Sequence, residues 1–252
     1  VNMYMDRMID KVRELSRVDQ VSLLGYCMGG SMSMMYTALH QEKVKNLVTM
    51  ATPFDFGAAE SILFKWGRDL PVEDIVHTFG NCPGGFLNMG FDAMKPFDKI
   101  DKMLSFKQGM MDDEFRNLFL AMEKWTSDAV AVPGKAYQEF LSDGFRDNRL
   151  KKGQFCVGEQ LIDLKNITCS YLNIVADKDT LVPPAASIKI SEHLGSSDKS
   201  LMNCPTGHIG LAVSGKALKG LWPQACQWLK ARSGEDRVVE NRLCKPRSEG
   251  KK

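Results

Sequence analysis

The chain has 252 residues, enough for one large α/β domain or for a domain with a cap. Its 33 basic and 31 acidic residues nearly balance, which argues against nucleic acid as the main partner, because a phosphate-binding surface needs an excess of Lys and Arg. Residues 233–252 hold six basic and four acidic side chains and are expected to form a charged, solvated tail.

Cofactor and membrane signals are missing from the sequence. No apolar run reaches the ~18 residues of a membrane span, and no secretion signal opens the chain. The seven cysteines are scattered without a C-x-x-C pair, which favours a reducing, cytoplasmic setting over disulfides or a zinc site. There is no Walker loop, no G-x-G-x-x-G and no metal-ligand cluster, so we expect neither a nucleotide cofactor nor a metal.

The first 51 residues have the rhythm of a parallel, doubly wound sheet. Apolar residues at helical spacing predict an amphipathic helix with one buried face; they are Met5, Met8, Ile9, Val12 and Leu15. The run 21–26 predicts a strand buried on both faces, 28–40 a helix of small residues, and 44–51 a second buried strand.

Residues 57–165 interrupt this rhythm with helical fragments separated by Gly and Pro. Eleven of the thirteen Phe lie here, which suggests a cap over an apolar site; an ordinary helical subdomain with its own core is the alternative. Strands are expected again at 167–176 and 199–204, with helices at 184–194 and 215–231. We therefore expect a core formed by 1–56 and 166–232, with 57–165 as the inserted cap and 233–252 as the tail.

Gly25-Tyr26-Cys27-Met28-Gly29 fits the nucleophile elbow G-x-S-x-G, with Cys in place of Ser. Such a turn places the nucleophile in a strained conformation between a strand and a helix. The residues two before and two after it are expected to lie so close that only glycine fits. The Met28 N–H, at the helix start, is then expected to point at a forming oxyanion.

A thiol of ordinary pKa needs a base, and the elbow fold predicts the chain order nucleophile, acid, histidine. Asp179 lies just after the strand 167–176, and His208 lies in the loop after the last strand. Asp177 competes with Asp179, and one of the two is expected only to cap the next helix. The other histidines, His40, His77 and His193, lack the loop position after the last strand. Cys82 and Cys204 are expected to be structural thiols.

Six motifs carry a family resemblance, and they are spread over nearly the whole chain. They are LLGYCMGG (23–30), TPFDF (52–56), W-x-x-D with PG-x-x-Y (125–137), N-x-L-x-x-G (148–153), D-x-LVPP (179–184) and GHIG (207–210). The chain resembles polyhydroxyalkanoate synthases, and the form GYCMGG is most similar to the catalytic subunit of the two-component class IV enzymes.

The resemblance implies an α/β-hydrolase fold with a helical cap and a thioester polymerase activity. Cys27 would attack a short-chain (R)-3-hydroxyacyl-coenzyme A such as 3-hydroxybutyryl-coenzyme A, and His208 would take the thiol proton. Asp179 would orient His208 and help to activate the hydroxyl of the incoming unit. The implied partners are a small second subunit and a cytoplasmic polyester granule, and an oligomer is possible. Coenzyme A would enter only as part of the substrate.

One departure from the family concerns the start of the chain. Only about 25 residues precede Cys27, whereas the fold normally has several strands and an oxyanion loop before the elbow. We therefore expect an N-terminally truncated chain with a bare strand edge, weak stability and poor activity by itself.

Two other functions fit the sequence. The first is a cysteine-nucleophile hydrolase, similar to a thioesterase or a dienelactone hydrolase. The second is a truncated, non-catalytic relative that binds granules or a partner through the aromatic insert.

Overall fold

A computed structural model describes residues 2–59, 61–94 and 97–234, and the expected tail 233–252 lies almost wholly outside this range. The core is a parallel four-stranded sheet in the order β1-β2-β5-β6. Its strands are β1 (Val21–Tyr26), β2 (Val44–Met50), β5 (Ser170–Ala176) and β6 (Lys199–Cys204). The short hairpin β3 (Cys156–Val157) and β4 (Gln160–Leu161) lies outside this sheet.

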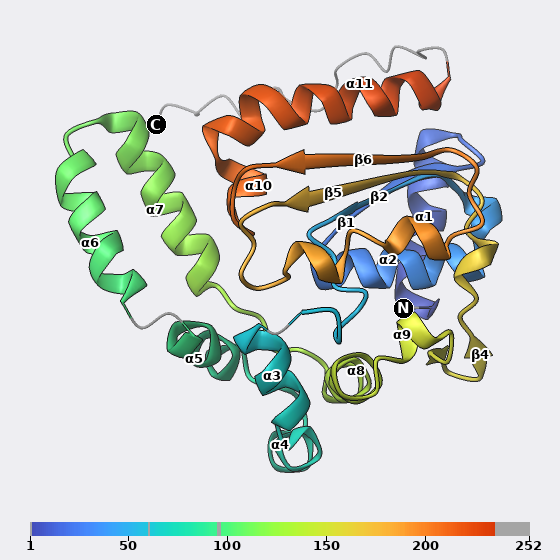
Figure 1. Cartoon of the computed structure of the whole chain (residues 1–252), viewed down its shortest axis with the longest axis horizontal. Coiled ribbons are helices and arrows are strands. Elements are labelled where there is room, and N and C mark those ends of the chain that lie inside the picture. Colours follow the sequence, from blue (N-terminus) through green and yellow to red (C-terminus); the bar gives the residue numbers. More distant parts are fainter. Residues whose placement is uncertain (1, 60, 95–96, 235–252) are drawn as a thin grey trace, which may run out of the picture.

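Helices cover both faces of the sheet and fill the segment 57–165, here called the cap (Figure 1). In the core they are α1 (Asn2–Ser16), α2 (Met28–Leu39), α10 (Gly210–Val213) and α11 (Trp222–Ser233). In the cap they are α3 (Ile62–Asp69), α4 (Val72–Phe79), α5 (Gly84–Met94), α6 (Asp98–Gly109), α7 (Asp113–Ser127), α8 (Gly134–Glu139) and α9 (Arg149–Lys152). A π-helical stretch, 140–146, joins α8 to the turn before α9.

The two central strands explain why the sheet is stable. Nearly every side chain of β2 and β5 is buried, as expected for parallel strands covered on both faces. On one face Leu47 and Tyr171 pack under α2, and on the other face Leu172 and Ile174 pack under α11. The carboxyl ends of these strands therefore form a rigid edge for a site.

Several expectations for local structure were wrong. The strand β1 is only half-buried, with Leu24 46% exposed, because among the described strands it pairs only with β2. The apolar stripe of α1 is also largely exposed at Met8, Val12 and Leu15, and Ile9 is its buried member.

Two expected helices also differ from the structure. Residues 184–194 form two short 3₁₀ turns, Pro184–Ala186 and Ile190–His193, in place of the expected helix. The closing helix contains a π-helical turn, Ala217–Leu221, directly before α11, and Pro223 lies in the first turn of α11.

Candidate active site

Cys27 lies at the sharp turn between β1 and α2. Its φ of 54° and ψ of −126° fall in a region that L-residues seldom adopt, which is the strain expected of a nucleophile elbow. Its backbone N–H donates to the carbonyl of Met50 at 2.9 Å, so the elbow is tied to the end of the neighbouring strand β2. The turn thus holds the thiol at the carboxyl edge of the sheet.

Close approach of backbone segments explains two of the glycines near Cys27. A Cβ on Gly25 would lie 2.5 Å from the carbonyl oxygen of Gly29, and a Cβ on Gly30 would collide with the Thr52 side chain. A Cβ on Gly29 would meet nothing within 4 Å. The expected steric need for glycine is therefore confirmed at position 25 and wrong at position 29, and the second crowded position is Gly30.

His208 reaches this edge from the loop after β6. Its Nδ1 lies 2.6 Å from Oδ2 of Asp179, and the Cys27 thiol is near enough to the ring to influence its titration. With Nδ1 engaged by the carboxylate, Nε2 is the ring nitrogen left for Cys27. Burial favours the neutral ring, but the hydrogen bond to Asp179 and the interaction with Cys27 outweigh it and raise the pKa of His208 to about 9.

Asp179 is the acid that the structure brings to His208. Its side chain is almost fully buried, and Oδ1 accepts hydrogen bonds of 2.9 Å from the N–H groups of Leu181 and Val182. These donors orient the carboxylate so that Oδ2 faces the imidazole. Asp177, its rival, is exposed and accepts a hydrogen bond from Asn203.

The other histidines occupy different surroundings. His40 stacks on Tyr36 with ring centroids 4.6 Å apart, and His193 packs against Phe54 at 4.8 Å. His77 is exposed on α4. Among the described side chains, His208 is thus the imidazole that the structure places between an acid and the elbow thiol.

Cys82 and Cys204 are both buried, and burial raises the pKa of each thiol.

Met28 starts α2, the position expected of an oxyanion donor. Among the described residues only α1 and a turn precede β1.

Sequence reasoning gave no role to Tyr26, the residue before the nucleophile. Its hydroxyl donates to the carbonyl oxygen of His208 at 3.1 Å, and its ring centroid lies 4.9 Å from that of the imidazole. Tyr26 therefore holds the backbone and the ring of His208, while Asp179 holds Nδ1. The feature of the sequence that could have indicated this role is the position of Tyr26 directly before Cys27.

An apolar cluster covers the thiol from the cap side. Cys27 packs against a group of buried residues drawn from the cap, from the loop after β2 and from the loop after β5. This group, here called the aromatic cluster, comprises Phe56, Phe64, Val72, Leu141, Phe145, Val182 and Ala186. The cluster places apolar side chains beside the sulfur, where they restrict access of water.

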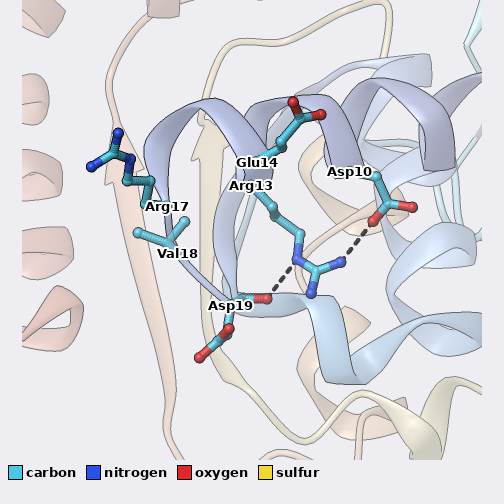
Figure 2. A pocket seen from close by; sticks show the side chains of 6 residues that line it. All are labelled: Asp10, Arg13, Glu14, Arg17, Val18 and Asp19. Carbon is cyan, nitrogen blue, oxygen red and sulfur yellow. Dashed lines mark hydrogen bonds and ion pairs between the residues drawn. The ribbon is translucent and has the colours of Figure 1, made fainter.

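A shallow hollow lies elsewhere, at the carboxyl end of α1 (Figure 2). The Arg13 guanidinium fills part of it and donates to Asp10 and to the carbonyl of Asp19, at 2.6 Å each. It adjoins the amino end of β1, whereas Cys27 follows the carboxyl end of that strand. It therefore has no part in the site.

The fold and the site can now be compared with known proteins. The sequence model of the alpha/beta hydrolase fold matches residues 2–212, and the chain belongs to this family. The expected fold class is thereby confirmed.

The curated relatives point to a more specific class of protein than the fold family does. The chain is 42% identical over 234 residues to the Poly(3-hydroxyalkanoate) polymerase subunit PhaC of Allochromatium vinosum, covering 92% of this chain and 66% of the relative. It is 39% identical to the subunit PhaC of Haloarcula marismortui, covering 95% of this chain and 51% of the relative. The resemblance to polyhydroxyalkanoate synthases is confirmed, and the chain spans about one half to two thirds of these relatives.

Solved structures support the fold alone. A monoacylglycerol lipase from Paleococcus ferrophilus matches with a TM-score of 0.53 at 14% identity, covering 91% of this chain and 73% of the lipase. The putative non-heme bromoperoxidase BpoC of Mycobacterium tuberculosis H37Rv matches with a TM-score of 0.50 at 15% identity, covering 92% and 72%. Within the described part of the chain, no helix combines the length and apolarity that crossing a bilayer requires.

Proposed function

We propose that this chain carries the catalytic machinery of a polyhydroxyalkanoate polymerase, with Cys27 holding the acyl chain as a thioester. The observation that carries the proposal is the strained elbow of Cys27 at the sheet edge where Asp179 binds His208 at 2.6 Å, with the thiol influencing the same imidazole. The names of the polymerase relatives supply the product class, a poly(3-hydroxyalkanoate), and the family resemblance implies a 3-hydroxyacyl-coenzyme A as the substrate.

Loading transfers the acyl group from coenzyme A to the enzyme. Because the pKa of His208 is raised to about 9, the imidazole holds the proton of Cys27 at neutral pH, and the sulfur bonds to the carbonyl carbon of the substrate while the Met28 N–H faces the developing oxyanion. The carbon–sulfur bond to coenzyme A then breaks, and the imidazolium returns the proton to the departing thiolate. One thioester replaces another, so the acyl group moves with little loss of free energy.

Extension of the polymer chain uses Cys27 and His208 again, with the hydroxyl group of the next substrate unit as the nucleophile. The 3-hydroxyl oxygen of the incoming unit attacks the thioester carbon, and the neutral imidazole left after loading takes the hydroxyl proton. The bond to Cys27 then breaks, which restores the thiolate beside the imidazolium and leaves the chain, longer by one unit, on coenzyme A, ready to be loaded again. Both oxygens of Asp179 are engaged, by His208 and by two backbone N–H groups. This favours His208 as the direct base, with Asp179 acting through it.

The experiment is incubation with 3-hydroxybutyryl-coenzyme A, with release of coenzyme A and formation of insoluble polymer as readouts. The parent chain, supplied with a small second subunit, is expected to form polymer, and Cys27→Ala is expected to form none. Cys226→Ala, which removes an exposed thiol, is the matched control and should behave like the parent. Polymer formed by Cys27→Ala would reject the mechanism.

A hydrolase is the second candidate, because the lipase neighbour shares the fold. The same incubation separates the two functions: free 3-hydroxybutyrate as the main product indicates a hydrolase, and polymer indicates a synthase. The aromatic cluster beside Cys27 favours the synthase, because an acyl-enzyme that waits for an alcohol must be protected from water.

A non-catalytic relative would differ in the reactivity of its thiols. A thiol paired with His208 should react with iodoacetamide at pH 7 faster than the exposed thiols of Cys156 and Cys226. If all three thiols are labelled at the same rate, Cys27 is not activated.

The partners and the location belong to the same proposal. We propose a small second subunit, a polyester granule and the cytoplasm, and no cofactor enters the reaction. Co-purification of the chain with granules from polymer-accumulating cells tests this, and its absence from washed granules would count against it.

A further inference from the structure

The loop that carries the triad acid, residues 179–186, is connected by hydrogen bonds to residues near both ends of the cap. At the entry of the cap, the Ser61 hydroxyl donates to the carbonyl of Leu181 at 3.2 Å. The same oxygen accepts the N–H of Phe64 at 3.1 Å and so caps α3. The start of the cap is thus hydrogen-bonded to Leu181, and the N–H of Leu181 in turn helps to orient the Asp179 carboxylate.

The end of the cap is connected to the acid loop indirectly, through Asp55, which lies just before the cap in the sequence. The carbonyl of Ala186, at the other end of the acid loop, accepts the N–H groups of Phe54 at 3.1 Å and Asp55 at 2.9 Å. The Asp55 carboxylate in turn accepts hydrogen bonds from Asn148 at 2.8 Å and from Lys151. Two motifs without a role in the reaction, TPFDF and N-x-L-x-x-G, therefore meet here.

Asn148 completes this junction. It adopts a left-handed conformation with φ of 51°, and its side-chain oxygen accepts the N–H of Phe56 at 3.2 Å. The Phe56 ring is thereby directed into the aromatic cluster, 4.4 Å from Phe145 and 5.2 Å from Phe64 between ring centroids. Cys27 packs against the same cluster.

The burial of Asp55 makes this junction hard to break. The residue is only 8% exposed, and burial opposes its ionisation. Hydrogen bonds from Lys151, Asn148 and the N–H of Gly57 outweigh burial and lower the pKa of Asp55. A buried carboxylate that loses its partners is strongly unfavourable, so the junction keeps one geometry.

We propose that Asp55 is a positioning residue that links the cap to the acid of the triad. It fixes the Ala186 end of the acid loop against Asn148 and Lys151, as Ser61 fixes the Leu181 end. This sets the hydrogen bond between Asp179 and His208, and through it the activation of Cys27. Its part in polymerisation rests on the proposed function, whereas its effect on the thiol does not.

The test compares Asp55→Asn with Asp147→Asn in the whole chain. Asp147 is a partly exposed residue near the same end of the cap that pairs with Arg149 at 2.7 Å, so its substitution is the matched control. The readout is the rate at which iodoacetamide labels Cys27 between pH 5 and 10, with folding checked by circular dichroism and thermal melting.

For Asp55→Asn we expect labelling at neutral pH to slow by about tenfold to a hundredfold, because small displacements of reacting groups have effects of this size. The pH profile should move toward that of an unassisted thiol, and Asp147→Asn should match the parent. A folded Asp55→Asn with the parent's profile would show that the junction is purely structural and would overturn the proposal.

Lys151→Met provides a milder variant if Asp55→Asn does not fold. It removes one donor from a half-exposed side chain, and the same shift is expected in smaller measure, with Lys151→Arg restoring the parent's profile. A folded Lys151→Met with an unshifted profile would also overturn the proposal. If labelling shifts as expected but no variant or parent forms polymer, the proposed function fails and the positioning role stands.

Discussion

The sheet edge and the hairpin of α6 and α7 are built in opposite ways. At the edge, Cys27, Asp179 and His208 follow the ends of parallel strands, and hydrogen bonds hold all three residues in place. In α6 and α7, none of the described side chains is buried, and the two helices pack on each other through Phe106 and Phe119, whose ring centroids are 4.7 Å apart. Figure 1 shows this hairpin standing apart from the sheet.

Only the sheet edge has to keep a fixed geometry, because proton transfer between a thiol, an imidazole and a carboxylate requires fixed positions, which the central strands provide. The hairpin exposes large apolar side chains, among them Met103, Met111 and Leu118, so its local stability is expected to be low. Substitutions in the two regions should therefore differ strongly in their effects.

The largest effect is expected from Asp179→Asn. Loss of the acceptor for Nδ1 should reduce polymer formation by about 10³-fold to 10⁴-fold, as in other triads. Asp177→Asn is the matched control and should retain nearly the parent's rate, because Asp177 is exposed and bonded to Asn203. Initial rates of coenzyme A release measure both, and equal losses would mean that Asp179 has no special role.

Truncation of one leucine in each region compares their packing. Leu172→Ala, in the centre of β5, should lower the free energy of unfolding by about 2–5 kcal/mol, because it leaves a cavity in a fully buried site. Leu118→Ala, on the exposed face of α7, should change it by less than about 0.5 kcal/mol. Urea denaturation gives both values, and a large loss at Leu118 would mean that the hairpin is better packed than its exposure indicates.

The titration of His208 should make stability depend on pH. Its pKa is raised from 6.5 to about 9, so the folded state binds the proton more tightly than the unfolded state. The stabilisation is complete below about pH 6.5 and is lost as the pH rises through about 9. The free energy of unfolding of His208→Gln should not show this decrease at alkaline pH. Urea titrations at several pH values measure it, and parallel curves for the two proteins would contradict the assignment.

The smallest effect is expected from Tyr26→Phe. The ring still packs on the imidazole, but the hydrogen bond to the carbonyl of His208 is lost, which corresponds to about 1 kcal/mol or about a fivefold slower reaction. Tyr4→Phe, on the exposed surface of α1, is the control. Rates of Cys27 labelling provide the measurement, and a loss as large as that of Asp179→Asn would show that the hydroxyl does more than position the loop.

Much of the fold could be predicted from the sequence, because buried parallel strands appear as short apolar runs. The strands at 44–50 and 170–176 are examples. The strand β1 gives the same pattern and yet is half-exposed, since an apolar run does not tell which neighbours cover it. The exposed stripe of α1 has the same cause.

The candidate site was accessible to prediction where chain order determines position. Asp179 and His208 follow the last strands, and parallel strands bring their carboxyl ends to one edge. The junction of Asp55 with Asn148 was not accessible, because 93 residues separate the partners and only the folded cap brings them together. The crowding at Gly30 depends in the same way on a side chain from another loop, Thr52.

The acid loop is bonded by Ser61 at the start of the cap and by Asp55 just before it, and Asn148 and Lys151 near the end of the cap hold Asp55 in place. These residues all lie outside helices α5, α6 and α7, so a change in these three helices is expected to leave the bonds on the acid loop intact. A chimaera that takes residues 84–127 from a relative should therefore keep the rate at which iodoacetamide labels Cys27.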